Sequence, residues 1–442
     1  MNQSLSKKFT FGSLILFALP TTIMMIVMSL YTIVDGIFIS RFVSTNALSS
    51  LNIVFPLINV AMGIGIMLST GSNAIVARKM GQGKPDEARK TFTSIVVLNL
   101  ILGAVLGLLG NLFAVPLSRL MGASDLLLAD CVSYLRWQMA FVPALMLQVL
   151  FQMFFVTEGR PGIGLFLTLL SGVCNVILDY VLIVPMQLGI AGAAIATVAG
   201  YLVTAVVGLF YFALSRRSLW LVPFRFHMGE LWETCSNGSS EMVSNLASGI
   251  ITFLFNLLMM HYAGEDGVAA ITIIQYSQFL LNALYMGFSQ GISPVIGFNY
   301  GSQNHIQLKQ VFRTALIFIG TTSVTVFLFA ELSGSLIVGI FAQPGTAVYG
   351  MARHGFTIFA VSFLFSGLNI FSSALFTALS NGRVSAIISF VRTFVLIVAS
   401  LAVLPLILGL DGIWLAIPIA EAGAVGMCVW YLRKNRKVYQ YI

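Results

Sequence analysis

The chain has 442 residues, of which 58% are hydrophobic and only 9% are charged, and its mean hydropathy is +0.96. A soluble domain cannot cover that much apolar surface, so the composition predicts a protein that lies in a lipid bilayer. The net charge of +8 then indicates membrane topology and contact with anionic lipid rather than nucleic-acid binding. The four cysteines show no paired spacing, and neither HExxH nor GxSxG occurs. The sequence therefore predicts no metal site built on cysteine pairs, no cofactor and no enzyme.

Apolar runs separated by charged or Gly/Pro-rich breaks predict twelve membrane-spanning helices. They lie near 11–40, 46–78, 91–117, 128–156, 162–184, 190–214, 238–262, 267–300, 311–332, 353–379, 384–408 and 412–432. Of the 23 Lys and Arg residues, 18 then fall on the side that holds both ends of the chain, and four fall on the opposite side: Arg41, Arg119, Arg136 and Arg353. This asymmetry predicts a multi-pass protein of the cell (inner or plasma) membrane with both termini in the cytoplasm.

The sequence also repeats itself. "GQGKPDEARKTF" (81–92) precedes the similar "GSQNHIQLKQVF" (301–312) by 220 residues, and the same offset pairs Gly71 with Gly291. We expect an N-lobe of six helices (1–214), a cytoplasmic inter-lobe loop (215–237) and a C-lobe of six helices with a basic tail (238–442). Because each half holds an even number of spans, the fold class is an all-α membrane protein with two lobes related by a pseudo-twofold axis along the membrane normal. Carriers that work by alternating access usually have this build.

Only four acidic residues fall within the predicted spans: Asp35, Asp179, Glu241 and Glu421. A carboxylate at that depth costs about 2.5 kcal/mol or more, so it usually faces a cavity. The helical rise brings four oxygen-bearing side chains to one depth in the outer half of the N-lobe: Asp35, Asn175, Asp179 and Thr197. The other half does not mirror them, because the offset of 220 sets Phe255, Ala399 and Ile417 at the matching positions. A purely structural role would predict acids in both halves.

Two further acids have other expected settings. Glu421 and Arg392 could form an ion pair, or both could line the central cleft. Glu241, close to the inner end of its helix, is expected at the membrane interface. The flexible side chains of the 19 methionines suit a cavity that accepts varied apolar shapes. Candidate residues of a substrate cavity are Met28, Tyr31, Met146, Gln275, Asn369, Arg392 and Glu421.

Three stretches resemble the multidrug and toxic compound extrusion (MATE) family: "LFALPTTIMMIVMSLYTIVDGIFISRF" (16–42), "ARKMGQGKPDEARK" (77–90) and "NVILDYVLIVPMQLGIAGAAIAT" (175–197). The third is the most specific, with N-x-x-x-D followed by G-x-x-G-A-A-x-A-T. The resemblance covers the whole chain, including the repeat and the span count. The loop "SRFVSTNAL" departs from the common V-G-R-L-G wording and is similar to MepA-like members; the prokaryotic DinF-like members are also similar.

This resemblance implies that Asp35, Asn175, Asp179 and Thr197 form a cation-responsive site in the N-lobe. It also implies that Pro20 lets the first helix bend, and a proline inside a helix predicts a bend or a local break on its own. Some Na⁺-coupled relatives carry an acid on the tenth helix, where this chain has Asn369, so no second ion site is expected there.

The sequence thus predicts a secondary antiporter that exports amphiphilic, cationic organic compounds in exchange for H⁺, the preferred ion, or Na⁺, held at Asp35 and Asp179. Its partners are small organic cations and the bilayer, and it is expected to be a monomer. A lipid-linked oligosaccharide flippase of the same wider fold is the alternative, although its phosphate-binding cavity would need several basic residues within the spans and Arg392 is nearly alone. An intramembrane enzyme lacks a catalytic constellation here, and twelve duplicated spans argue against a receptor.

Overall fold

A computed structural model describes residues 3–442; for Gln3, Ser4, Gly36, Ile37, Ser40, Arg41, Thr45 and Leu48 it describes the backbone alone. The predicted outer position of the Arg41 side chain, like residues 1–2 of the predicted N-lobe, therefore lies outside the described residues. Every regular element in 3–442 is helical. The elements are α1 (Gln3–Ser6), α2 (Phe11–Phe38), the π-helical turn η1 (Ile39–Val43), α3 (Thr45–Gly81), α4 (Pro85–Leu112), α5 (Ala114–Leu120), α6 (Leu128–Ala140), α7 (Val142–Thr157), α8 (Pro161–Ile183), α9 (Gly189–Leu214), α10 (Met228–Gly301), α11 (His305–Phe341), α12 (Ala347–Ala360), α13 (Phe363–Ala378), α14 (Gly382–Phe390), the π-helical turn η2 (Val391–Val395), α15 (Leu396–Leu408) and α16 (Leu410–Tyr439).

These elements make twelve spans, as predicted. Among the described residues, nine helices are long and apolar enough to cross a membrane, and the bent pairs α6–α7 (54°) and α12–α13 (55°) add two more. The helix α10 counts once in that tally, yet its 74 residues hold two spans, because the backbone leaves helical geometry at Gly264 (φ 64°, ψ −153°). Positive φ there suits glycine, which has no Cβ to clash. The first of these two spans begins at Met228, earlier than the start expected near 238.

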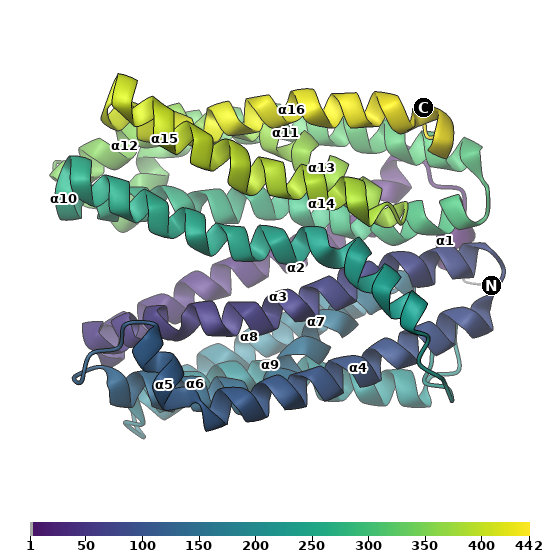
Figure 1. Ribbon diagram of the computed structural model, residues 1–442, viewed down its shortest axis with the longest axis horizontal. Helices are drawn as coiled ribbons and strands as arrows, with labels where there is room; N and C mark the ends of the chain where they lie inside the picture. Colours follow the sequence, from purple (N-terminus) through teal and green to yellow (C-terminus); the bar gives the residue numbers. More distant parts are fainter. Residues whose placement is uncertain (1–2) are drawn as a thin grey trace.

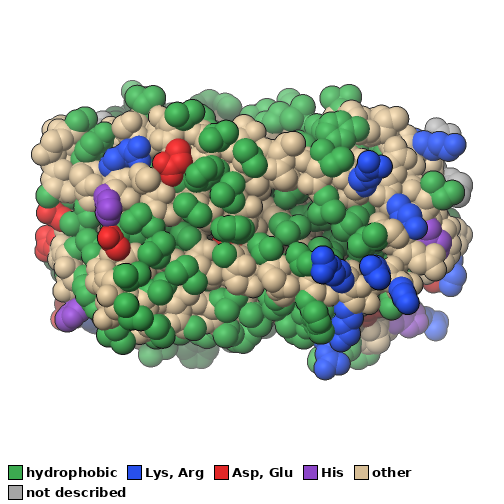
Figure 2. Space-filling view, turned by 90° about the horizontal axis from the view of Figure 1, so that it is seen from above, with side chains coloured by type: hydrophobic (Ala, Val, Ile, Leu, Met, Phe, Trp, Pro, Cys, Tyr) green, Lys and Arg blue, Asp and Glu red, His purple; other side chains and the backbone are tan. Residues whose placement is uncertain are grey.

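The helices form two layers whose axes run along the long dimension of the molecule. In Figure 1, α2 to α9 make up one layer and α10 to α16 the other, and both termini lie at the same end. We call it the terminal end. Figure 2 shows charged side chains gathered toward the two ends of this dimension, with Lys and Arg concentrated at the terminal end and a hydrophobic band between. Such a band is the surface that a bilayer requires.

Two close backbone contacts between the lobes reproduce the sequence repeat. A Cβ on Gly81 would lie 2.1 Å from the carbonyl oxygen of Phe298, and a Cβ on Gly301 would lie 2.1 Å from that of Arg78. Both residues of the first contact lie 220 positions from their counterparts in the second, so one contact maps onto the other when the lobes are exchanged. A pseudo-twofold axis therefore relates the lobes and passes between these two helix ends.

The expected break in the first helix is absent. The helix α2 is continuous through Pro20 from Phe11 to Phe38, although the proline ring removes one backbone donor. Packing explains the continuity, because α10 lies directly against the turn that follows the proline: a Cβ on Gly287 would lie 2.5 Å from the Cα of Thr22. A local break at Pro20 is thus absent from this conformation, and a bend there stays a prediction.

Candidate functional site in the N-lobe

Two acidic side chains meet inside the N-lobe. Asp35 on α2 and Asp179 on α8 lie close enough for each carboxyl group to act on the charge of the other, and Asp179 is only 1% exposed. Two ionised carboxylates repel each other and have no proton to share. The contact is therefore stable only when one carboxyl group carries a proton or when a cation lies beside the pair.

The other two predicted residues, Asn175 and Thr197, lie on α8 and α9. Asn175 is one turn before Asp179 on α8 and is 2% exposed, and Thr197 on α9 is 8% exposed. The hydroxyl of Thr197 donates to the backbone oxygen of Ala193 (3.0 Å). The helix α9 packs against α8 at Gly200, where a Cβ would lie 3.4 Å from the backbone oxygen of Ser171, an ordinary contact. Three helices thus bring the four side chains to one region of the lobe.

Three tyrosines surround the acids. Tyr31 on α2, Tyr134 on α6 and Tyr201 on α9 all lie close enough to Asp35 for its charge to act on their hydroxyl groups, and Tyr134 also lies near Thr197. The sequence predicted Tyr31 but missed the other two. Tyr201 follows Thr197 by one helical turn, so helical spacing could have found it. No sequence pattern around Tyr134 on α6 indicates that it lies near the acids.

Several polar atoms of this site have no hydrogen-bond partner among the described residues: both carboxylate oxygens of Asp179, both amide atoms of Asn175 and one oxygen of Asp35. Buried polar atoms without partners are costly, so the site can accept a proton, a water molecule or a small cation. Within residues 3–442, no three His, Cys, Asp or Glu side chains cluster as metal ligands. A cation bound here would therefore also need the oxygens of Asn175 and Thr197.

The buried acid of the C-lobe is fully paired. Arg392, on η2, donates from Nε (2.9 and 3.0 Å) and Nη2 (2.8 Å) to the carboxylate of Glu421 on α16. Asn369 on α13 donates to Oε2 of Glu421 (2.7 Å) and to its backbone oxygen (2.9 Å). Glu421 is 3% exposed. Of the two arrangements that the sequence allowed, the structure contains the ion pair.

The remaining cavity candidates divide by exposure. Met28 on α2 and Gln275 on α10 are half-buried, whereas Met146 and Asn369 expose no surface. Met146 packs against α3, where a Cβ on Gly65 would lie 3.2 Å from its Cγ. In this conformation Met146 lies in the N-lobe core, and its place in a substrate cavity stays a prediction.

A small cavity lies where the lobes meet. Its volume is about 20 Å³, enough for one water molecule. Its lining comes from α3 and α7 of one lobe and from α10 and α13 of the other: Thr70, Asn73, Met153, Glu241, Gln290, Ser293, Ala374 and Thr377. Glu241 was expected at the membrane interface, and its contact with this inter-lobe cavity corrects that expectation.

At the terminal end the lobes are joined by two ion pairs and by close packing. Lys79 on α3 pairs with Glu230 on α10 (2.7 Å), and Arg78 pairs with Glu233 (2.8 Å). A Cβ on Gly71 would lie only 2.0 Å from the carbonyl oxygen of Thr234. The N-lobe acids are farther along α2 and α8, so this closed contact lies on one side of them.

Comparisons with known proteins agree with this architecture. The chain is 25% identical over 441 residues to the multidrug export protein MepA of Staphylococcus aureus (strain bovine RF122 / ET3-1), covering 96% of this chain and 94% of that protein. It superimposes on a MATE crystal structure in complex with MaL6 (TM-score 0.94, 22% identity, 100% and 99% coverage). A multidrug resistance MATE family transporter in an outward-facing conformation gives a TM-score of 0.93, with 22% identity and 100% and 98% coverage. The MatE family model matches twice, at residues 20–181 and 242–403, once in each lobe, and the chain therefore belongs to the MatE family.

Proposed function

We propose that this protein is a secondary antiporter that exports amphiphilic organic cations in exchange for H⁺, with Na⁺ as the alternative coupling ion. The observation that carries the proposal is the buried pair of Asp35 and Asp179, in which both oxygens of Asp179 and one oxygen of Asp35 have no hydrogen-bond partner among the described residues. A carboxylate that no protein group neutralises can hold a proton or a cation and release it again. The relatives named as multidrug export proteins support the export of drugs.

Uptake of one ion relieves the repulsion between the two acids. With a proton on one carboxyl group, the pair shares a hydrogen bond; with Na⁺, Asn175 and Thr197 add oxygens around the ion. Either event draws α2 toward α8, because both acids then bind the same particle. In this proposal, movement of α2 reduces the cavity of the N-lobe and weakens drug binding, so that drug leaves on the outer side. The coupling must be reciprocal, so drug weakens ion binding by the same factor.

The contact at the terminal end supports alternating access. Two ion pairs and the packing of Gly71 against Thr234 seal the lobes on that side. We infer that the terminal end faces the cytoplasm, since 18 Lys and Arg are predicted there, and that this conformation therefore faces outward. An inward-facing state has to break these contacts. The proposed units remain the N-lobe (1–214) and the C-lobe (238–442) of a monomer in the plasma membrane, joined by the cytoplasmic segment 215–237, which is a loop only up to residue 227 because α10 begins at Met228.

The flippase alternative needs a free cationic group in the central cavity. Arg392 does not supply one, because Glu421 occupies its guanidinium. The antiporter is therefore the better-supported function.

Uptake of an organic cation into liposomes that contain the purified protein tests the proposal. Purified protein in liposomes should accumulate a fluorescent organic cation when a proton gradient, acid inside, is imposed, and should not do so without a gradient. A sodium gradient applied alone identifies the coupling ion. Gradient-independent movement of a fluorescent lipid-linked sugar, with no cation transport, would instead establish the flippase.

A further inference from the structure

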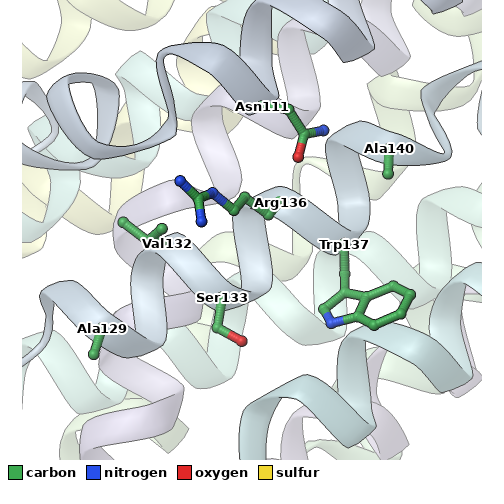
Figure 3. A pocket seen from close by; sticks show the side chains of 7 residues that line it. All are labelled: Asn111, Ala129, Val132, Ser133, Arg136, Trp137 and Ala140. Atoms are coloured by element: carbon green, nitrogen blue, oxygen red, sulfur yellow. The ribbon is translucent and has the colours of Figure 1, made fainter.

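A second candidate binding site lies on the N-lobe, away from the acids and from the lobe contact. It is a groove of about 470 Å³ between the end of α4 and one face of α6. Its lining is Asn111, Ala129, Val132, Ser133, Arg136, Trp137 and Ala140 (Figure 3). All but Asn111 belong to α6, and the small side chains among them leave the helix surface hollow. The proposed function uses none of these residues.

The groove lies at the level of lipid headgroups. Lys90 is the last charged residue of α4, and 21 residues separate it from Asn111, about 32 Å along the helix. The hydrocarbon core of a bilayer is about 30 Å thick. Asn111 therefore reaches the interface opposite the terminal end. Trp137, which is 40% exposed, suits that depth, since indole rings prefer the membrane interface.

The surroundings of the groove face lipid rather than protein. Leu108 (61% exposed) and Leu112 (66% exposed) project from α4 beside Asn111. In Figure 1, the end of α4 next to α5 and α6 lies at the bottom of the N-lobe layer, on the side away from the C-lobe layer. An acyl chain can follow these leucines down from the groove.

The charge in the groove has no internal partner. Arg136 is exposed, and no described acidic side chain lies within ion-pair distance of it, whereas Arg119 on the same outer side pairs with Asp125. Figure 3 shows the guanidinium of Arg136 and the ring of Trp137 extending in different directions from one turn of α6. An unpaired guanidinium at this depth favours a phosphate group, which it can bind through two parallel hydrogen bonds.

The polar atoms beside Arg136 add selectivity. Asn111 uses its Nδ2 to donate to the backbone oxygen of Gly107 (3.1 Å), which leaves its Oδ1 free to accept. Figure 3 shows that oxygen on the side of Asn111 that faces α6. Ser133 adds a hydroxyl that can donate to a phosphate oxygen. Together they fit a phosphodiester that carries a hydroxylated headgroup.

We propose that this groove binds one anionic phospholipid of the phosphatidylglycerol type. Arg136 and Ser133 hold its phosphodiester, Asn111 accepts a hydrogen bond from a headgroup hydroxyl, and the acyl chains lie along Leu108 and Leu112. The bound lipid anchors the α4–α6 side of the N-lobe at a fixed depth. The proposal does not depend on drug transport.

Quenching of Trp137 fluorescence by brominated lipids tests it. Full-length protein is reconstituted in phosphatidylcholine vesicles that contain increasing fractions of brominated phosphatidylglycerol or brominated phosphatidylcholine. The Trp137 signal is the difference between wild type and Trp137→Phe. We expect half-maximal quenching at an about fivefold lower fraction of the glycerol lipid, the effect of one basic residue at a membrane surface. Equal fractions for the two lipids in the wild-type protein would overturn the proposal.

Two variants and one competing anion test whether Arg136 causes the preference for the glycerol lipid. Arg136→Gln should abolish the preference, while Arg353→Gln should retain it, because Arg353 already donates to Thr357 and to the backbone oxygen of Glu331. A preference that remains in Arg136→Gln would contradict the proposal that Arg136 binds the lipid phosphate. Loss of the wild-type preference on addition of inorganic phosphate would identify a site for soluble phosphate and equally overturn the lipid proposal.

Discussion

In the N-lobe, both oxygens of Asp179 and one oxygen of Asp35 have no hydrogen-bond partner among the described residues, whereas in the C-lobe Arg392 and Asn369 donate to the carboxylate of Glu421. The two lobes share a fold, so the difference lies in what surrounds the acids. An acid held by fixed donors cannot take up and release a cation without losing structure, because an unpaired buried charge is left behind. The N-lobe pair has no such bonds to lose. Substitution of the N-lobe acids should therefore impair transport, and substitution of the C-lobe ion pair should impair stability.

The largest expected effect is on transport in the N-lobe. Asp179→Asn or Asp35→Asn removes the group that takes up the ion, so gradient-driven uptake of the organic cation should fall at least about tenfold, to the leak rate, and drug binding should lose its pH dependence. The thermal unfolding midpoint should hold or rise, because the repulsion between two acids is removed. Asp266→Asn, an exposed change between two C-lobe spans, is the matched control. Wild-type transport with unchanged pH dependence in Asp179→Asn would reduce Asp179 to a structural residue.

The next effect is on stability in the C-lobe. Glu421→Leu or Arg392→Met alone leaves one buried charge unpaired and should destabilise the protein by about 3–5 kcal/mol. The double variant removes both charges and should recover most of that loss. Thermal unfolding of the three variants in detergent measures the effect. If the double variant is no more stable than the singles, the pair is not the reason for the destabilisation.

Sequence alone could predict the acids of both lobes, because a charge within an apolar run is visible locally. The span count and the repeat were visible for the same reason. The residues it missed or misread depend on distant partners. The segment 228–237 was read as part of a loop because of its polar residues, yet it forms the first turns of α10, where Glu230 and Glu233 pair with Lys79 and Arg78 of the other lobe.

The same limit applies to the sites. Tyr134 reaches the acids from a helix remote in sequence, and Met146 fills the core because Gly65 leaves room for it. Pro20 predicted a bend or a local break, but the helical assignment of α2 continues through it, next to the close approach of Gly287. Tertiary packing decided each case, and a single sequence contains no direct record of it.

The lobe contacts offer a smaller, graded comparison. Gly71 and Gly291 are equivalent by the repeat, yet a Cβ would lie 2.0 Å from the Thr234 carbonyl oxygen at the first and 3.1 Å from Ala18 at the second. Gly71→Ala should therefore destabilise the closed contact at the terminal end by about 1–3 kcal/mol, the usual cost of overpacking. Gly291→Ala should destabilise it by less. Gly63→Ala is the control, because its nearest contact is an ordinary 3.5 Å.

Maleimide labelling of the native, half-buried Cys235, read by peptide mass spectrometry, reports this opening. Its rate should rise about five- to 150-fold in Gly71→Ala, which is the factor that 1–3 kcal/mol gives. An equal rate in Gly71→Ala and Gly63→Ala would contradict the idea that this contact seals the lobes.

The last expected effect is spread over several pH units and concerns an acid that, among the described residues, has neither a carboxylate partner nor an ion pair. Glu158 follows α7 at the terminal end and accepts backbone hydrogen bonds from Ser218 (3.1 Å) and Leu219 (2.9 Å), which tie the inter-lobe loop to the N-lobe. Burial raises the pKa of Glu158 to about 7, against the opposing effect of those two donors and of Arg160 and Arg217. The position 220 residues later is Ala378, so the C-lobe lacks this group.

Because the pKa of Glu158 is higher in the folded than in the unfolded protein, its contribution to stability is complete below about pH 4.5 and is lost as the pH rises to about 7. The free energy of unfolding should therefore fall by up to about 1 kcal/mol per pH unit across that window through this group. Glu158→Gln keeps an acceptor for the loop but removes the titration, so its thermal unfolding should depend less on pH between these limits than that of the wild type. Glu87→Gln, at an exposed position on the same end, controls for surface charge. Identical pH profiles for wild type and Glu158→Gln would contradict this prediction. They would mean that the loop moves when Glu158 ionises, so that the charge does not lower the free energy of unfolding.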